Sequence, residues 1–353
     1  MGLSQARPVA VARLLVVDDS VVVRRVVTRA FENEPTVEVI GTARDGRDAL
    51  NKFELLRPDV VILDLEMPVM DGFETLAEIR RTHPEIPVVI FSHLTTTSAK
   101  ATLEALSLGA SEFALKPTAD GIGLAEEHVR AQLLPLIKAL AMPTGRPLTV
   151  ATSPSRAAAS GRVAAVVVAV STGGPNVLAT IVSRLPADLP VPVLIVQHMP
   201  PVFTKMLAER LDHQSALSVV EASAGDAIVP GRVYVAPGGR HMALSAGGGN
   251  VRVVLHDGSP ENFCRPAADV LFRAAVDVYG AGVLAMVLTG MGRDGLRGSE
   301  AVRAAGGSVL AQSESTCTVP SMPAAVALAG LANAVVPLDD LGAALVQRVS
   351  RGR

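Results

Sequence analysis

Short apolar runs alternate with helical patterns along most of this 353-residue chain, and this alternation constrains the fold more than any other feature. Strands that alternate with helices form parallel sheets covered by helices on both faces. The first 140 residues therefore predict an α/β fold with a doubly wound, flavodoxin-like sheet. The expected strands are 13–17, 37–42, 60–63, 88–91 and 112–115, and the expected helices are 20–34, 46–57, 71–82, 97–108 and 125–141.

The alternation stops at residues 141–162 and resumes at 163. This intervening segment is rich in Pro, Ser, Ala and Gly and has three arginines but no acidic residue, which is typical of a flexible linker. We therefore expect a domain at 1–140, a linker at 141–162 and a second, Rossmann-like α/β domain at 163–353. The second domain is expected to have strands at 163–170, 191–197, 283–289 and 308–312, helices at 200–212, 265–279, 295–305, 322–329 and 338–349 and one begun at Pro175, and β-hairpins within 218–255.

Composition excludes several classes of function. Hydrophobic residues make up 49% of the chain and charged residues 19%, as in globular proteins with large buried sheets. The net charge is −2, and no basic stripe interleaved with aromatics is present, so we expect no nucleic-acid binding. No apolar run reaches the roughly 18 residues that span a membrane. Two cysteines outside any metal-ligand spacing, and an N-terminus unlike a signal peptide, predict a cytoplasmic protein.

Polar residues end four of the five expected strands in the first domain. Because the carboxyl ends of parallel strands meet at one edge of a sheet, these residues should converge there. Carboxylates are ligands for Mg²⁺, and Asp64 could attack a phosphoryl group whose charge the metal and Lys116 neutralise. Ser92 could then bind the acyl phosphate, and Phe113 could repack. One strand-terminal Asp is usually a cap or turn residue, but the combination favours a functional site. The converging residues are the metal ligands Asp18, Asp19 and Asp64, with Ser92 and Lys116.

A second set of polar residues follows apolar strands in the second domain. Ser171 follows an eight-residue apolar run and opens the turn STGGP, where Gly173 and Gly174 allow close backbone approach. Amides at the start of the next helix would suit oxyanion stabilisation. His198 ends VPVLIVQH, and Asp294 follows VLTGMGR. A hydroxyl, an imidazole and a carboxylate at one sheet edge form a candidate nucleophile, base and orienting group.

Each of these residues also has a simpler interpretation. Ser171 could be a helix N-cap, His198 a polar strand end, and Asp294 the N-cap of the following helix. The STGG turn could cradle a phosphate, although the chain contains no GxxxxGK[ST] motif. It is not a G-x-S-x-G elbow, because Ala169 replaces the first glycine. His241 in APGGRHM is a competing imidazole, less suited because it is expected in a hairpin.

The two domains resemble known families. The DD, DLEMPVMDG, S and KP elements within residues 11–135 resemble the receiver domain of bacterial response regulators. This resemblance implies phosphorylation of Asp64 by a histidine kinase of the chemotaxis type. The strings AVSTGGP, QHMPPVFT, GDAIVPGRVYVAPGGRHM, RPAADVLF and LTGMGRDG resemble the catalytic domain of CheB-type protein-glutamate methylesterases. That resemblance implies a triad of Ser171, His198 and Asp294, with oxyanion contacts from the backbone near Thr172 and Met291.

The resemblance further implies a phosphorylation-activated enzyme of chemotaxis-type adaptation. Its reactions would be hydrolysis of glutamate methyl esters, and deamidation of glutamines, on the cytoplasmic helices of methyl-accepting chemoreceptors. We expect Mg²⁺ in the receiver, no cofactor at the esterase site, and a monomer. The family commonly has Asn, His or Arg before RPxxDxLF, whereas this chain has Asn262-Phe263-Cys264, which bears on the receptor recognised. Two rivals are a non-catalytic response regulator and a DNA-binding one, the latter lacking a basic output domain and a recognition helix.

Overall fold

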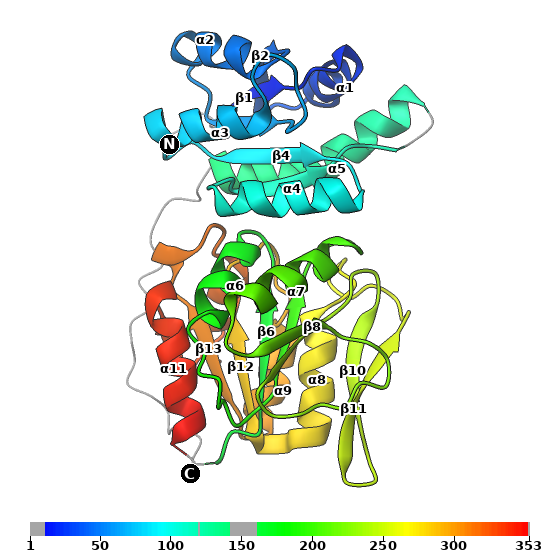
Figure 1. The fold of residues 1–353 in the computed structure, drawn as a ribbon, viewed down its shortest axis with the longest axis vertical. Helices are drawn as coiled ribbons and strands as arrows, with labels where there is room; N and C mark the ends of the chain where they lie inside the picture. Colours follow the sequence, from blue (N-terminus) through cyan, green and yellow to red (C-terminus); the bar gives the residue numbers. More distant parts are fainter. Residues whose placement is uncertain (1–10, 119–120, 142–160, 352–353) are drawn as a thin grey trace, which may run out of the picture. The chain divides into compact units, whose positions relative to one another are not determined.

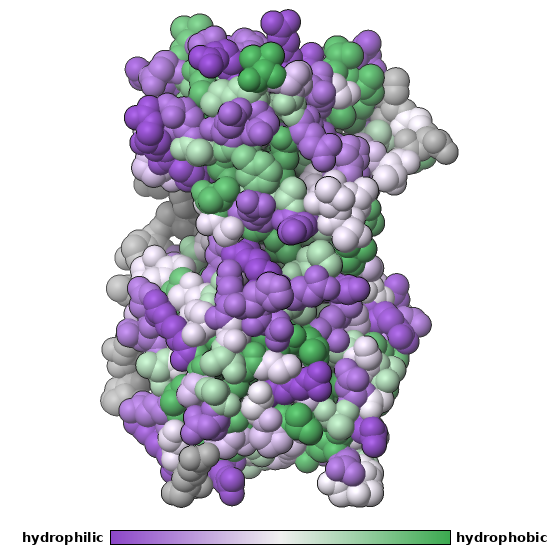
Figure 2. Space-filling view, in the orientation of Figure 1, coloured by the Kyte–Doolittle hydropathy of each residue, from purple (hydrophilic) through white to green (hydrophobic). Residues whose placement is uncertain are grey.

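The computed structural model describes residues 11–118, 121–141 and 161–351. The chain divides into two compact units, Met1–Gly145 and Arg146–Arg353, which we describe separately (Figure 1). The predicted linker lies almost entirely outside the described residues, so its limits stay a prediction. No helix in the described ranges is long and apolar enough to cross a membrane. Figure 2 shows polar and apolar side chains intermixed on the visible face of each unit.

The first unit contains a five-stranded parallel sheet in the order β2-β1-β3-β4-β5. A strand-helix alternation with this order is the doubly wound arrangement that the apolar periodicity predicts. Each expected strand and helix is present, with ends shifted by a few residues. The strands are β1 (Ala12–Val17), β2 (Val37–Ala43), β3 (Val60–Leu63), β4 (Val88–Ser92) and β5 (Glu112–Leu115); the helices are α1 (Val21–Phe31), α2 (Gly46–Leu56), α3 (Gly72–Thr82), α4 (Thr96–Ser107) and α5 (Ile122–Ala141).

Burial explains why the strands of this unit read as continuous apolar runs. All four residues of β3 and all five of β4 are buried, as expected for inner strands of a parallel sheet covered on both faces. Helices α1 and α5 pack over one face against β1, β3 and β4. Helix α3 begins with a capping box between Asp71 and Glu74, which satisfies backbone amides that the helix itself leaves unpaired.

The second unit is built on a seven-stranded parallel sheet in the order β14-β13-β12-β6-β7-β9-β8. All six residues of the central strand β6 are buried. Its neighbours β12 and β7 bring their carboxyl ends to the same edge. The sheet strands are β6 (Ala165–Val170), β7 (Val193–Gln197), β8 (Ser218–Glu221), β9 (Arg232–Val235), β12 (Val283–Val287), β13 (Ser308–Gln312) and β14 (Ala334–Val336).

Helices and one separate hairpin complete this unit. The hairpin stands beside α8 in Figure 1 and forms a two-stranded antiparallel sheet of its own. Helix α8 packs on β6, β7 and β12 within the main hydrophobic core of the unit. The hairpin strands are β10 (His241–Gly247) and β11 (Asn250–His256); the helices are α6 (Gly174–Val182), α7 (Phe203–Gln214), α8 (Ala268–Tyr279), α9 (Leu296–Ala304), α10 (Ser321–Leu328) and α11 (Leu338–Ser350).

One prediction for this unit is wrong in part. Residues 218–255 were expected to form β-hairpins, but only β10 and β11 do so. Strands β8 and β9 run parallel to each other and to β7, and they extend the main sheet. The turn-rich segment between β8 and β9 passes alongside β11, where Ile228 donates its amide to the Val251 carbonyl at 2.9 Å. This crossover replaces the tight turn that the glycines and prolines of the segment suggest.

Candidate active site

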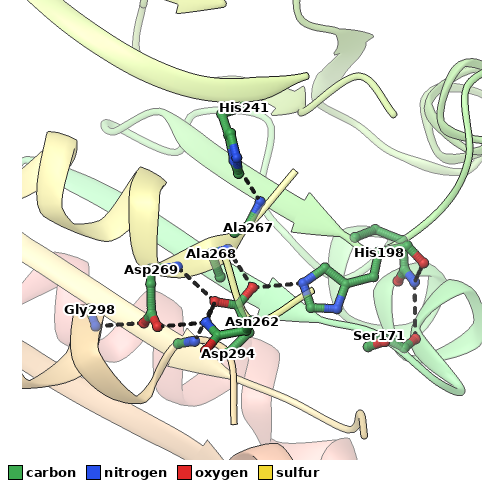
Figure 3. Close-up of polar contacts among 11 residues, drawn as sticks. Ser171, His198, His241, Asn262, Ala267, Ala268, Asp269, Asp294 and Gly298 are labelled. Carbon is green, nitrogen blue, oxygen red and sulfur yellow. Dashed lines mark hydrogen bonds and ion pairs between the residues drawn. The ribbon is translucent and has the colours of Figure 1, made fainter. Parts of the chain in front are cut away.

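Three side chains lie at the carboxyl ends of neighbouring strands in the second unit, as predicted. Ser171 follows β6, His198 follows β7, and Asp294 follows β12. The turn after β6 is compact because Gly173, the N-cap of α6, has a φ of 77°, in the left-handed region that glycine tolerates. In Figure 3 the imidazole of His198 lies between the Asp294 carboxylate and the Ser171 turn.

His198 and Asp294 form a close pair. Nε2 of His198 lies 2.7 Å from Oδ2 of Asp294, and the Asp294 side chain is buried. Burial lowers the pKa of His198, but hydrogen bonds to Asp294 and to Cys264 outweigh it and raise the pKa to about 9. The pair therefore favours the protonated imidazole, the state that a base reaches after taking a proton.

Asp294 stays ionised in its buried position because donors surround it. Its oxygens accept the backbone amides of Ala268 at 2.6 Å, Asp269 at 3.0 Å and Gly295 at 3.0 Å. Burial raises the pKa of Asp294, but the bond from His198 and the amides of Ala268 and Asp269 reverse the shift and lower it. Two of the amides open α8, so Asp294 does sit at a helix N-terminus. It caps α8 and not the helix that follows it, since α9 has no side-chain cap.

The Ser171 hydroxyl is free to act as a nucleophile. Helix α6 has no side-chain cap, which excludes the interpretation of Ser171 as an N-cap. The hydroxyl makes no hydrogen bond with any described residue, and this includes the His198 imidazole. The backbone of Ser171 is firmly held: its amide donates to Thr289 at 3.0 Å, and its carbonyl accepts Nε2 of Gln197 at 3.0 Å. Gly290 packs so closely that a Cβ there would lie 2.7 Å from the Cβ of Ser171.

Two backbone amides near Ser171 are available for an oxyanion. Thr172 is buried at the start of the turn, and Met291 is exposed in the loop between β12 and Asp294. Neither amide donates a hydrogen bond to a residue that the structure describes. Backbone donors held without a partner beside a nucleophile are what oxyanion stabilisation requires. Their use in catalysis stays a prediction.

His241, the competing imidazole, has a structural environment. It is 1% exposed, and both ring nitrogens are occupied. Nδ1 accepts the Ala267 amide at 3.2 Å, and Nε2 lies 3.0 Å from the Ser259 carbonyl, which requires Nε2 to carry the proton. With neither nitrogen free, His241 fixes the segment that leads into α8.

The sequence reasoning missed two polar residues behind the pair. Nδ2 of Asn262 donates to Oδ1 of Asp294 and to Oδ2 of Asp269, both at 2.9 Å (Figure 3). Asp269 is fully buried and accepts the Gly298 amide at 2.6 Å. Burial, and the charge of Asp294, raise the pKa of Asp269. The one sequence signal for this network was Asp269 itself, the Asp of the RPAADVLF motif, and the motif alone does not indicate what that residue does.

The polar residues of the first unit also converge at a sheet edge. Nζ of Lys116 lies 2.8 Å from Asp18 Oδ2 and 2.7 Å from Asp64 Oδ2. These two carboxylates raise the pKa of Lys116 although burial opposes them. Ser92 is buried and its hydroxyl accepts that of Thr102 at 2.9 Å. Phe113 is half-buried on β5, opposite Ile90 of β4.

This acidic cluster fits a divalent cation. Oxygens of Asp18, Asp19 and Asp64 all lie within 4.8 Å of one another. Burial, and then the neighbouring Asp64 charge, raise the pKa of Asp18 even though Lys116 opposes the shift. Apart from its ion pair with Lys116, Oδ2 of Asp18 is a buried oxygen without a hydrogen bond among the described residues. Hard oxygen donors with excess negative charge suit Mg²⁺.

Comparisons with known proteins agree with this architecture. The family model described as CheB methylesterase matches residues 166–345, and that of the response regulator receiver domain matches residues 14–124. The protein-glutamate methylesterase/protein-glutamine glutaminase of a Nocardioides species is 46% identical over 353 residues, which cover 97% of this chain and 96% of the relative. The enzyme of the same name from Trichodesmium erythraeum is 42% identical over 347 residues, which cover 96% of this chain and 99% of the relative.

A solved structure supports the fold of the second unit. The crystal structure of the Thermotoga maritima CheB methylesterase catalytic domain is 42% identical in sequence, with a TM-score of 0.52. It is matched over 98% of its own chain and covers 52% of this one. That share corresponds in size to the unit that contains Ser171, His198 and Asp294.

Proposed function

The chain belongs to the CheB methylesterase family, and a response regulator receiver domain precedes its esterase unit. On this basis we propose that it is an esterase regulated by phosphorylation. The protein hydrolyses methyl esters of glutamate side chains and deamidates glutamine side chains, as the names of its relatives state. Its substrates are the cytoplasmic helices of methyl-accepting chemoreceptors. The observation that carries the proposal is the His198–Asp294 pair beside an unbonded Ser171 hydroxyl.

We propose a role for each member of the triad that agrees with the geometry. Because Asp294 occupies Nε2 of His198, Nδ1 is the nitrogen that takes the proton as Ser171 Oγ attacks the ester carbonyl. The amides of Thr172 and Met291 stabilise the negative charge that develops on the carbonyl oxygen. The imidazolium returns the proton to the leaving oxygen, and methanol departs to leave an acyl group on Ser171. Water then attacks that ester, again with His198 as base, and free glutamate is released. With glutamine the leaving group is ammonia.

The first unit supplies regulation. We propose that Asp18, Asp19 and Asp64 hold Mg²⁺, which would neutralise the charge of an incoming phosphoryl group there. The Asp64 carboxylate accepts the phosphoryl group from a histidine kinase, with Lys116 beside it. Ser92 hydrogen-bonds the acyl phosphate, and Phe113 repacks in response. This change activates the esterase. The esterase site itself uses no cofactor.

The defining test is loss of the nucleophile. Ser171→Ala should lower methanol release from a methylated receptor fragment by roughly 10⁴- to 10⁶-fold, because triad members act as a unit. Ser183→Ala, an exposed serine at the other end of α6, is the matched control and should retain full activity. If Ser171→Ala kept more than about a tenth of wild-type activity, Ser171 would not be the nucleophile.

A further inference from the structure

A tight turn adjoins the triad and has an unusual backbone. Glu261 and Cys264 exchange two backbone hydrogen bonds, at 3.1 and 2.9 Å, around the residues Asn262 and Phe263. Those two residues have φ values of 53° and 62°, the positive pair typical of a type I′ turn. Asn adopts this conformation readily, but for a bulky aromatic residue it is unfavourable. A strained residue of this kind persists only where its surroundings fix it, and such residues concentrate at functional sites.

Hydrogen bonds hold the turn to Asp294 on one side and to helix α8 on the other. The Asn262 side chain bridges Asp294 and Asp269. Phe263 is therefore the immediate sequence neighbour of a residue that contacts the triad. On the other side, Glu261 forms a bidentate ion pair with Arg273 of α8, at 2.9 and 2.6 Å. The position of Phe263 is therefore fixed relative to His198 through short hydrogen bonds.

Phe263 itself faces solvent. Its relative exposure is 103%, and no other aromatic residue that the structure describes is among the exposed large hydrophobic residues. A solvent-facing ring on an unfavourable backbone contributes nothing to the core of the unit. Aromatic rings held rigidly at a surface are instead characteristic of the central contacts of protein interfaces.

The charge around the turn indicates which partner fits. Arg293 is exposed on the loop that contains Asp294, and Arg297 is exposed on α9, the helix that follows this loop. Arg273 forms an ion pair with Glu261, and Arg297 lies close enough for its charge to help lower the pKa of that carboxyl, so arginines form a rim beside the turn. An apolar ring within an arginine-rich rim suits an acidic helix that also has an apolar side chain. The glutamate-bearing helix of the proposed reaction has the acidic part of this chemistry.

We propose that Phe263 is the apolar anchor that seats the substrate helix, a specificity-determining contact that rests on the proposed esterase function. Phe263 packs on an apolar side chain that lies on the same helix face as the modified glutamate, at i±3, i±4 or i±7, about one or two turns away. The arginine rim contacts neighbouring acidic side chains. The anchor contributes to binding of the helix and takes no part in bond making or breaking.

The test compares two substrates with the full-length protein. One is a methylated cytoplasmic fragment of a chemoreceptor, and the other is a blocked glutamate γ-methyl ester no larger than one residue. Phe263→Ala should raise the KM for the receptor fragment about five- to thirtyfold, the range for truncating an interface aromatic, and leave kcat within about twofold. Hydrolysis of the small ester should be unchanged. Phe263→Tyr should restore receptor binding. Leu328→Ala, an exposed apolar residue at the end of α10, is the matched control and should change neither substrate.

The outcomes separate the anchor from the esterase function. If Phe263→Ala leaves the receptor KM unchanged, the anchor is refuted while the esterase function stands. If it lowers activity equally on both substrates, the turn only supports the triad, and the anchor is again refuted. If the wild-type protein hydrolyses neither substrate, the proposed function fails and the anchor falls with it.

Discussion

His198, the proposed general base, should control the pH dependence of the esterase in a direction that its hydrogen-bond partners determine. A general base acts only when unprotonated, and the hydrogen bonds of His198 raise its pKa to about 9. Only about 1% of the free enzyme then has a neutral imidazole at pH 7. We expect kcat/KM to rise about tenfold per pH unit near neutrality and to level off above pH 9.

Replacing Asp294 by Asn removes the charge and keeps the shape. Burial lowers the pKa of His198, and the bond to Asp294 is the largest cause that raises it. With only the bond to Cys264 left to oppose burial, loss of the carboxylate should move the rise in kcat/KM by about one pH unit toward acid. The plateau should also fall by about 10³- to 10⁴-fold, since an amide cannot stabilise the imidazolium. The control is Asp269→Asn, the same change at a buried carboxylate that does not contact the imidazole, and it should shift the profile far less.

Methanol release from the small ester over pH 5.5–10, corrected with Ser171→Ala for spontaneous hydrolysis, measures both quantities.

Folding provides a second readout. A histidine whose pKa rises from 6.5 to about 9 on folding stabilises the protein fully below pH 6.5, and this stabilisation disappears as the pH rises through 9. The loss is about 3 kcal/mol. The two tyrosines, Tyr234 and Tyr279, both lie in the esterase unit and there is no tryptophan, so tyrosine fluorescence follows that unit in urea titrations. Identical pH profiles for wild type and Asp294→Asn would refute this reasoning.

Two further predictions distinguish the remaining roles. His198→Ala should cost about as much activity as loss of the serine. His241→Ala should mainly destabilise the esterase unit, by about 1–3 kcal/mol, because it leaves the Ala267 amide and the Ser259 carbonyl unpaired. If assays of methanol release and urea stability gave the reverse effects, the two assignments would be exchanged. Asp64→Asn should abolish phosphoryl incorporation from a small donor with Mg²⁺ and remove any activation of the esterase by that donor, and full labelling of the variant would move the phosphorylation site to Asp18 or Asp19.

Much of the architecture could be predicted because buried parallel strands read directly as apolar runs. The runs before Ser171, His198 and Asp294 each lead to the same sheet edge, so the convergence of these three residues could be predicted from the apolar runs. Their roles as a triad came only from the family resemblance. Strand β14 was missed because three residues are too short for a periodic pattern. Strand β9 was assigned to a hairpin because turn residues indicate a change of direction without indicating the neighbour that the strand will pair with.

The supporting network behind the triad could not be predicted in the same way. Asn262 reaches Asp294 across 32 positions of sequence, and it does so only because a turn with two positive φ values directs its side chain inward. Nothing in a linear pattern distinguishes that Asn from a solvated loop residue. Likewise, a cap of the next helix was one interpretation that the sequence left open for Asp294, and only the packing of α8 showed which amides it accepts.

The close approach of Gly290 to Ser171 also limits how this enzyme can diverge. A single methyl group at that position would collide with Ser171, the proposed nucleophile, and with Met322, and at Gly174 it would collide with Gln197. Random mutation at these positions would therefore mostly produce inactive chains, not chains with altered selectivity. Variation that survives selection should accumulate instead at Phe263, because its side chain faces solvent, whereas the neighbouring Asn262 contacts Asp294. Directed evolution toward other ester-bearing helices would do best to randomise position 263 and leave Asn262 and the glycines fixed.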